Sequence, residues 1–529
     1  MNRFRIPALC LSFLCLAVSA VGQEGVRNYE YAKEINPVLS FSNASSLSVF
    51  GEGGISKACL SFRKDNGAVV PLDGSNDSWA AGAGTESFKR VSDKLVFSGK
   101  VYYEFFLGQN MGAQVLLDPL GSPVNFLEED SAAVGVKQRE SYSLSGGLSY
   151  AFSDAWAIGV KLDYNAKDRT KHKDPRFQND LVDLSVAPGF WYSPSGSLGF
   201  GVNLLYRHSL EQIKAKLYGT VDRQYYINVD QGGFIGTVED FDGDIGYISV
   251  TNTRPMANDW YGISVQLVSG SNTKLYNQLS GQWRTGYFGT RSSTSVVFCE
   301  FNGPEAVYNG TLDLPAANAL HRVELNAAYR MLLNFTNSYS YKVEDGMPTE
   351  VIYNGKNLSL TRHDIDASLA YTLYKGSGVF RPDWVLHAEA DAFCRLQKTT
   401  VFPIYRNHNY VTYNALLSGE RNFSFGLSML GVTLRLNYTG GLGTPKQDGY
   451  TAGGASKLKS FDDYLNRQFE FDTAARAGAG IEFSYTWTEF SGIAPYIKLS
   501  EQFQSLLDEP EYLGGRFRNV AMLTVGCSF

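Results

Sequence analysis

Long apolar runs are scarce in this chain, and their scarcity argues against a helical membrane protein. A membrane-spanning helix needs about 20 consecutive apolar residues. After the first 22 residues, the longest uncharged run is 184–206, and Ser-Pro-Ser-Gly interrupts it at 193–196. Because proline and glycine break a helix, this run is typical of two strands joined by a tight turn.

Cysteine and charge are also sparse. Two of the 6 cysteines lie in the first 22 residues, and the other four have no paired spacing (Cys59, Cys299, Cys394 and Cys527). A chain of this length with so few cysteines is not a disulfide scaffold. Charged residues make up 19% of the chain, and 53 acidic residues outnumber 47 basic ones, which argues against a nucleic-acid partner.

Catalytic and cofactor motifs are missing as well. None of the 6 histidines stands in a metal-binding spacing or near a nucleophile motif, and there is no glycine-rich dinucleotide or phosphate loop. We therefore expect no cofactor, no metal and no catalytic residues, so that the protein is not an enzyme.

The N-terminus has the layout of a cleaved secretory signal peptide. Arg3 and Arg5 precede an apolar stretch, and small residues follow it up to Gly22. We expect residues 1–22 to be removed after export, which leaves a net formal charge near −8. A signal-anchor helix that stays in the membrane is the alternative.

The chain is rich in aromatic residues, in glycine and in segments where apolar and polar residues strictly alternate. Aromatics reach 14% and glycines number 53. In SLGFGVNLLYRH, residues 197–208, apolar side chains occupy the even positions from Leu198 to Tyr206, with Gly199, Gly201 and Asn203 between them. The same pattern recurs at 142–164, 365–371, 384–390, 432–438 and 477–487. Segments of about nine to eleven residues with one apolar face and one small, polar face are typical of strands that cross a bilayer around a polar lumen.

These segments predict an all-β fold, a transmembrane antiparallel up-and-down β-barrel of about sixteen strands, within a range of fourteen to eighteen. The barrel is assigned to residues 94–529, and residues 23–93 form a plug, a first hairpin, or both. The stretch 286–345 shows no clear strand boundaries, and within it 321–335 fits either a strand or a short helix.

Turn lengths suggest how the barrel is oriented. Short turns are expected at 153–155, 193–197, 375–382 and 489–492, and long polar loops at 165–182, 208–257, 398–420, 440–472 and 503–516. Outer-membrane barrels have short periplasmic turns and long extracellular loops. If the last strand ends in the periplasm, every short turn falls on the periplasmic side.

Two groups of residues are singled out as candidate functional positions. His387, Glu389 and Asp391 alternate along one predicted strand, so all three face the lumen as a polar cluster or a proton or substrate site. The chain ends in an amphipathic strand that finishes on Phe529. The final strand of bacterial outer-membrane barrels resembles this one, which implies an assembly signal read by the barrel assembly machinery.

Two longer stretches carry a resemblance to a known family. NPVLSFSNASSLSVFGEGGIS at 36–56 and ESFKRVSDKLVFSGKVYYEF at 86–105 resemble an uncharacterised outer-membrane β-barrel family of the Bacteroidota, a domain of unknown function. The opening stretch is also similar to long-chain fatty-acid transport channels, whose N-terminus plugs the barrel. The resemblance implies a fold and a location in the outer membrane of a Gram-negative bacterium, and it implies no site residues.

We therefore expect a porin-like channel or an accessory component for nutrient uptake across the outer membrane, in contact with outer-membrane lipid. A non-conducting binding or scaffold barrel that works with lipoproteins or a TonB-dependent transporter is the first alternative. An outer-membrane hydrolase is the second.

Overall fold

The computed structural model describes residues 27–51, 53–119, 121–128, 133–219, 224–241, 247–249, 252–345, 349–376, 378, 380–451, 458–488, 490 and 492–529. The predicted signal peptide, residues 1–22, lies outside these ranges.

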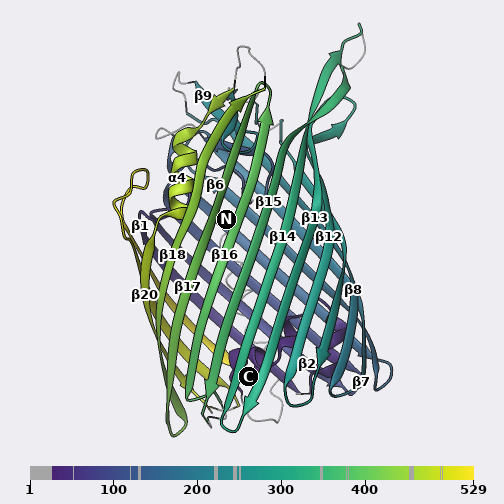
Figure 1. Cartoon of the computed structure of the whole chain (residues 1–529), viewed down its shortest axis with the longest axis vertical. Coiled ribbons are helices and arrows are strands. Elements are labelled where there is room, and N and C mark those ends of the chain that lie inside the picture. Colours follow the sequence, from purple (N-terminus) through teal and green to yellow (C-terminus); the bar gives the residue numbers. More distant parts are fainter. Residues whose placement is uncertain are drawn as a thin grey trace, which may run out of the picture.

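Eighteen antiparallel strands form a closed barrel (Figure 1). Each strand pairs with the next one along the chain, and the last strand, β22, pairs with β1 to close the barrel. The strands are β1 (Gly54–Gly67), β2 (Asp77–Ser92), β3 (Leu95–Met111), β5 (Gly135–Ala151), β6 (Trp156–Lys171), β7 (Arg176–Ser195), β8 (Leu198–Lys216), β11 (Met256–Ser269), β12 (Lys274–Ser292), β13 (Ser295–Ala316), β14 (Ala319–Lys342), β15 (Glu350–Lys375), β16 (Trp384–Val401), β17 (Ile404–Phe425), β18 (Ser428–Tyr450), β20 (Arg476–Trp487), β21 (Ala494–Leu506) and β22 (Phe517–Ser528). The predicted up-and-down barrel is confirmed, with a strand number at the upper end of the predicted range.

The two faces of each strand differ as the alternation predicts. On β8, Leu204 is 60% exposed on the outside, whereas its neighbour Asn203 is 1% exposed on the inside. Large apolar side chains are exposed in the same way on most strands. In the described part of the chain, the other sheet lies inside the barrel and does not cover this surface. The exposed apolar side chains therefore meet the acyl chains of a bilayer.

One rim carries short turns, whereas the other rim carries both short turns and the long connections. The turns after β5, β7, β15 and β20 fall at the predicted positions, and the C-terminus lies at the same rim as these turns (Figure 1). The connections after β8 and β18 span residues 217–255 and 451–475 and are long, and their described parts lie toward the other rim. This arrangement confirms the predicted asymmetry of turn lengths.

Two of the predicted long loops are wrong. Residues 165–182 and 398–420 continue as strands, and the chain turns only at 172–175 and 402–403. The polar residues in these ranges suggested loops. A strand hairpin that extends past the bilayer into water keeps its interstrand hydrogen bonds, and it needs no apolar face. For the same reason the strands are 12 to 26 residues long, not nine to eleven.

The stretch without clear boundaries, 286–345, contains the end of β12 and all of β13 and β14. Residues 321–335 are therefore strand, not helix. Alanines at 327 and 328 and a short spacing of apolar residues weakened the alternation there.

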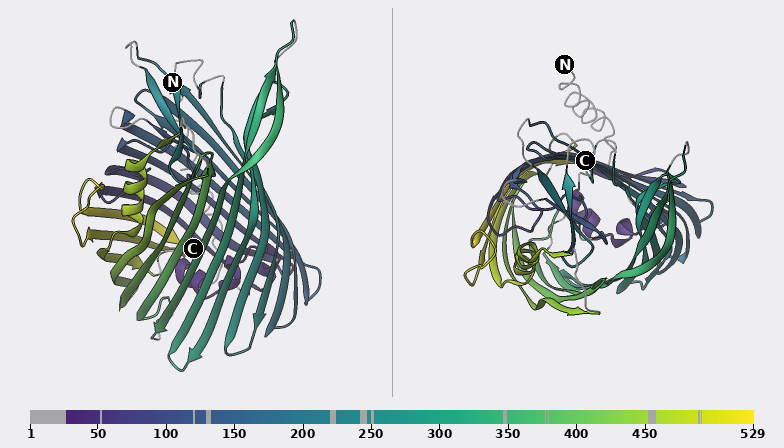
Figure 2. Two further views of the ribbon diagram at one scale, coloured as in Figure 1. Left: turned by 45° about the horizontal axis from the view of Figure 1, so that its top comes forward. Right: turned by 90° about the horizontal axis from the view of Figure 1, so that it is seen from above.

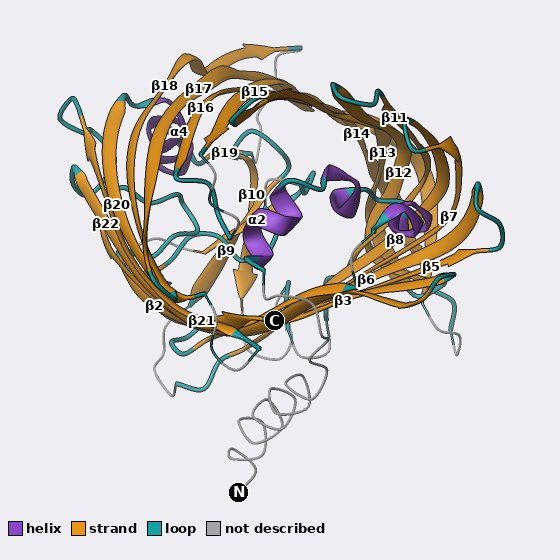
Figure 3. Cartoon of the chain, turned by 90° about the horizontal axis from the view of Figure 1, so that it is seen from below, coloured by secondary structure: helices purple, strands orange, loops and turns teal. Residues whose placement is uncertain are grey.

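Residues before position 94 contribute both to the wall and to the lumen. The wall begins at Gly54, because β1 and β2 are its first hairpin. Residues 27–51, here called the N-terminal segment, lie inside the barrel and contain the helices α2 (Tyr29–Glu34), η2 (Pro37–Ser40) and η3 (Ala44–Val49) (Figure 3). Among the described residues, no helix is long and apolar enough to span a bilayer.

A second, four-stranded sheet lies in the lumen near the rim of long loops (Figure 2). This lumenal sheet consists of β4 (Asn125–Glu128), β9 (Tyr225–Asp230), β10 (Ile235–Phe241) and β19 (Lys459–Ser460), and the helix α4 (Asp462–Thr473) follows β19. All four residues of β4 are buried. The sheet packs on an apolar core that includes Phe126, Ile227, Phe288, Phe301 and Leu360.

Candidate functional site in the barrel lumen

The N-terminal segment is anchored by buried amide side chains. Asn43, 1% exposed, caps η3 by accepting a hydrogen bond from the backbone N–H of Ser45 at 3.1 Å. Its Nδ2 donates to the carbonyl of Phe190 at 3.0 Å and to Oε1 of Gln266 at 3.0 Å. Gln266 in turn donates to Asn203 at 2.8 Å. One side chain therefore joins the segment to β7 and β11, and through Gln266 to β8.

Glycines on the inner face of the wall make room for this anchor. A Cβ atom at Gly189 would lie 2.2 Å from Oδ1 of Asn43, and one at Gly159 would lie 2.4 Å from the nitrogen of Ser45. Neither distance is compatible with a side chain, because the neighbours are a buried anchor and backbone. The glycines that alternate along these strands are thus explained by the close approach of η3.

Charged groups anchor the first half of the segment. Lys33 pairs with Glu86 of β2 at 2.7 Å. Arg322 donates to the carbonyl of Glu34, and Arg381 lies 3.6 Å from the Glu34 carboxylate. Burial raises the pKa of the Glu34 carboxyl, and Arg381 opposes this effect.

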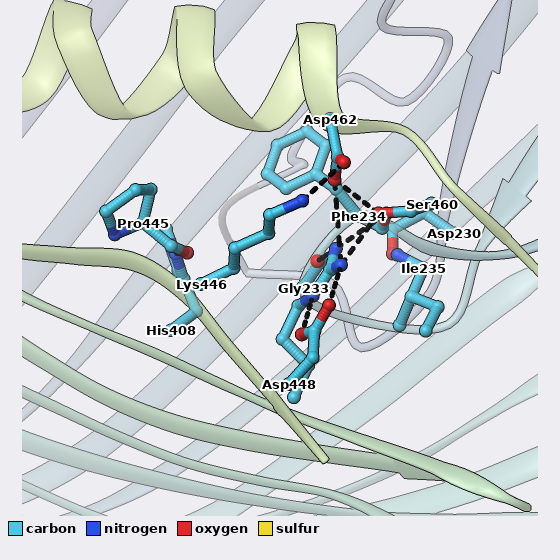
Figure 4. Close-up of polar contacts among 11 residues, drawn as sticks. Asp230, Gly233, Phe234, Ile235, His408, Pro445, Lys446, Asp448, Ser460 and Asp462 are labelled. Atoms are coloured by element: carbon cyan, nitrogen blue, oxygen red, sulfur yellow. Dashed lines mark hydrogen bonds and ion pairs between the residues drawn. The ribbon is translucent and has the colours of Figure 1, made fainter. Parts of the chain in front are cut away.

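At the other rim, Arg406 holds the lumenal sheet against the wall. Figure 4 shows its partners Gly233, Phe234, Asp448 and Ser460 close together. Arg406 projects from β17, is 1% exposed, and binds Asp448 of β18 through two hydrogen bonds of 2.7 Å. Its Nη1 donates to the carbonyls of Gly233 and Phe234 at 3.0 and 3.2 Å, and its Nη2 donates to Ser460 at 2.7 Å. One guanidinium therefore links two wall strands to the turn between β9 and β10 and to β19 at one edge of the lumenal sheet.

The turn between β9 and β10 presents its carbonyls to Arg406. Gly232, Gly233 and Phe234 have φ values of 104°, 68° and 58°, a left-handed backbone that glycine adopts without strain. Asp230 accepts hydrogen bonds from the N–H groups of Gly232 and Ile235 at 2.9 and 3.3 Å. Burial nevertheless raises the pKa of the Asp230 carboxyl to about 7.

Between the lumenal sheet and the middle of the barrel lies a central cavity of about 510 Å³. Its walls are rich in arginine: Arg207, Arg284, Arg330, Arg362, Arg395 and Arg476. Its aromatic residues are Trp260, Phe393 and Tyr410. These side chains come from the inner faces of eight wall strands, from β8 to β20.

Three of these arginines have a close carboxylate partner. The pairs are Arg395 with Asp364 at 2.7 Å, Arg330 with Asp366 at 2.8 Å, and Arg207 with Asp183 at 2.5 Å. Asp472 of α4, which also faces the cavity, accepts hydrogen bonds from Gln468 at 3.1 and 3.2 Å. Burial raises the pKa of Asp472 above its usual range, which favours its neutral form.

The predicted cluster on β16 does face the lumen. Nδ1 of His387 lies 2.8 Å from the hydroxyl of Thr372, and Nε2 lies 3.3 Å from Glu389. Asp391 is two residues further and accepts a hydrogen bond from Asn414 at 3.0 Å. The three side chains share a face but are satisfied by different neighbours, as in a hydrogen-bonded lumen surface. In the described part of the chain, no group of three or more His, Cys, Asp or Glu side chains could hold a metal ion.

Phe529 lies where the barrel closes. Its backbone N–H and carbonyl exchange hydrogen bonds of 3.0 and 2.8 Å with Ser56, directly before the register of β1 with β22. The last residue thus extends the closing pair of strands.

The arginines of the cavity and Arg406 were not singled out by sequence reasoning. The signal that could have found them is parity: Arg362, Asp364 and Asp366 alternate on one strand with exposed residues such as Ile365 between them. The charged residues on the inner face of β15 lie beside Arg395 on the inner face of β16. Only the strand register shows which residues pair.

Comparison with known proteins gives a family and a set of barrels. A family model described as "Family of unknown function (DUF6850)" matches residues 46–529. No curated protein matches the sequence. The outer membrane transporter YddB from Escherichia coli is 9% identical, with a TM-score of 0.40 over 89% of this chain and 80% of that one. BauA, the ferric preacinetobactin receptor from Acinetobacter baumannii, is 9% identical, with a TM-score of 0.38 over 90% and 80% of the two chains.

Proposed function

Because the chain belongs to a family of unknown function (DUF6850), we propose its function from its own geometry: it is an outer-membrane channel for uptake of a small polar nutrient. The observation that carries the proposal is a space inside the barrel made of adjacent cavities. Such a space gives a solute a place to bind between the two rims.

The space consists of three cavities that share walls. A cavity of about 390 Å³ under the lumenal sheet shares Arg362, Arg395 and Tyr410 with the central cavity. The central cavity shares Phe393 and Thr412 with a third one of about 420 Å³, which Asp391 also lines. These volumes are those of small-molecule sites in proteins, about 300–1,000 Å³.

The N-terminal segment forms the constriction on the periplasmic side. Between the segment and the wall lies a further cavity of about 390 Å³, lined by Lys33, Glu86, Lys161 and Asp163 among others. A solute that leaves the central cavity passes this segment. With the segment as the gate, we expect transport through the barrel to be passive.

Conductance in planar bilayers tests the proposal. The purified wild-type protein should show discrete conductance steps. Gly189→Val should enlarge them, because a side chain there displaces Asn43 and with it η3. Gly146→Val is the matched control, since Gly146 lies on the outer face of β5 with no atom within 4 Å of an added Cβ, and its conductance should equal wild type.

Asn43→Ala serves as a second opening variant, because it removes the anchor without adding volume to the wall. If the wild type, Gly189→Val and Asn43→Ala are all silent while the barrel is folded, the channel is refuted.

A second candidate function is favoured by the number of contacts that hold the segment. Asn43, Lys33 and Glu34 all bind the wall, as in a non-conducting barrel that acts as a scaffold for lipoproteins or a TonB-dependent transporter. Mild-detergent purification from native membranes tests it. A stoichiometric lipoprotein or transporter supports the scaffold, and a single species contradicts it.

The proposal includes no catalytic step and places the protein in the outer membrane of a Gram-negative bacterium. His387→Gln and Glu389→Gln should leave any hydrolytic activity of the preparation unchanged. Sedimentation of native membranes in a density gradient should find the protein with the outer-membrane fraction, and recovery in the inner-membrane or aqueous fraction would contradict this location.

A further inference from the structure

Two buried arginines of the central cavity, Arg284 and Arg362, donate no hydrogen bond to a carboxylate of the described residues. Arg476 forms no ion pair with a described carboxylate, but it donates to a backbone carbonyl of α4. Arg284 is 8% exposed, and its Nε and Nη2 both donate to Oδ1 of Asn258, a neutral group, at 3.0 and 2.6 Å. Arg362 is 6% exposed, and its Nη1 donates to the carbonyl of Ser122 at 3.1 Å. Burying a guanidinium without a counter-charge is costly, so such groups usually have an anionic partner.

The carboxylate near Arg362 is already occupied. Asp364 receives two hydrogen bonds from Arg395, at 2.7 and 2.9 Å, and lies 3.5 Å from Nε of Arg362. That Nε is buried and makes no hydrogen bond. Two guanidinium groups therefore share one carboxylate, and Arg362 lines the cavity without a carboxylate of its own.

Arg284 is held in a fixed orientation by aromatic rings. Its guanidinium lies 5.2 Å from the ring of Trp260 and 5.1 Å from that of Phe301. Trp260 donates in turn to Glu305 at 3.0 Å. A planar donor that is fixed before the ligand arrives loses little entropy on binding a carboxylate or phosphate.

The remaining carboxylates of the cavity do not offset these two charges closely. Glu305 accepts hydrogen bonds from Trp260 and from Gln282, the latter at 2.9 Å. Asp118 is exposed and accepts from the N–H of Gly121 at 3.1 Å. Neither forms an ion pair of 4 Å or less with a described arginine of the cavity, and water screens Asp118.

We propose that the central cavity binds a small anionic solute whose carboxylate or phosphate group is held by Arg284 and Arg362. Trp260, Phe393 and Tyr410 contact the rest of the solute. This inference rests on the proposed function, because it names the substrate class of the same lumen.

Calorimetric titration of the folded, detergent-purified protein tests the inference with three probes of the same carbon-chain length. Succinate, 1,4-butanediol and 1,4-diaminobutane are four-carbon molecules that differ in charge. We expect saturable binding of succinate and none of the diol or the diamine. Equal or tighter binding of the diol or the diamine, or no binding of any anion, overturns the proposal. Inorganic phosphate, titrated separately, shows whether the site prefers a phosphate or a carboxylate.

Variants locate the site. Arg284→Gln and Arg362→Gln should each weaken succinate binding at least about tenfold, because each removes a charge-assisted contact. Arg435→Gln is the matched control: Arg435 faces the lumen from β18 outside the cavity and pairs with Glu482 at 3.1 Å. It should bind succinate as the wild type does. Wild-type affinity in both cavity variants overturns the assignment.

If either cavity variant fails to fold, the three-probe titration of the wild type still decides the charge class. Conductance and binding can also fail separately. A silent barrel that binds succinate retains the anion site and loses the channel, whereas a conducting barrel that does not bind any anion retains the channel and loses the site.

Discussion

Single side chains in the lumen carry contacts that the barrel wall alone does not supply. Asn43 joins the N-terminal segment to the wall, and Arg406 joins the lumenal sheet to it. Both are buried and saturated with partners, so replacing either leaves several polar groups unpaired. An unpaired buried donor or acceptor costs about 1–3 kcal/mol.

Arg406→Gln is therefore expected to loosen the lumenal sheet without opening the barrel. Amide hydrogen exchange of residues 225–241 should accelerate about ten- to hundredfold, in line with a loss of about 1–3 kcal/mol. Amides of β14 and β15 should exchange as in wild type.

The control for this experiment is Arg291→Gln, at an exposed position near the end of β12, which should change neither region. Unchanged exchange of 225–241 in Arg406→Gln would mean that the apolar core alone holds the sheet.

At the scale of elements, the lumenal sheet and the N-terminal segment are attached in different ways. The sheet packs on an apolar core and ends in a turn whose carbonyls face Arg406. The segment packs Tyr29, Leu47 and Phe50 against Phe88 and is tied by hydrogen bonds along its length. Apolar packing does not titrate, so within the lumenal sheet the polar turn is the part expected to respond to pH.

Attachment of the turn between β9 and β10 should weaken as pH rises. The pKa of Asp230 is about 7 in the folded sheet and 3.8 for an ordinary aspartate, so the attached turn binds more protons than a released one. The stabilisation is fully present below about pH 4 and is lost as pH rises through about 7.

Hydrogen exchange of residues 225–241, corrected for the intrinsic pH dependence of exchange, should show less protection at pH 8 than at pH 5. Asp230→Asn has no charge to gain and should abolish the difference. If the variant keeps the pH dependence of wild type, another group is responsible.

At the scale of the whole molecule, closure of the barrel depends on β1 and β22, which are the first and last strands of the chain. Their register runs from Lys57 with Ser528 to Gly67 with Arg518, and Phe529 extends it through Ser56. The barrel can thus close only after the last residue is available. The backbone of Phe529 makes these bonds, so its side chain is free to act as a signal.

Phe529→Ala should reduce the amount of heat-modifiable barrel in native outer membranes several-fold while leaving the melting temperature of the refolded protein unchanged. The reason is that backbone pairing with Ser56 needs no aromatic ring. Phe517→Ala, at the other end of β22 and 56% exposed, is the control and should assemble normally. Equal amounts of both variants in the membrane would contradict the role of Phe529.

The sequence by itself determined which residues face lipid, because a strand has a period of two and the outer face must be apolar. The same period predicted the barrel, the rim that carries short turns, and the inward orientation of His387, Glu389 and Asp391. It missed the strand hairpin around 402–403, because the polar residues there have no apolar face that hydrophobicity can reveal. It also missed 411–417, although Val411, Tyr413 and Leu417 alternate on the exposed outer face.

Only the tertiary structure decided what fills the lumen. Asn43 and Gln266 are 223 residues apart, and Arg406 and Gly233 are 173 apart, so no local pattern brings them together. The inner side chains of a barrel occupy every second position of a strand. Their partners depend on the register between strands and on which segments fold into the lumen. The outer face could be predicted from the sequence because every strand meets the same solvent there, which is lipid. Each lumenal contact, in contrast, joins particular residues that are distant in the sequence.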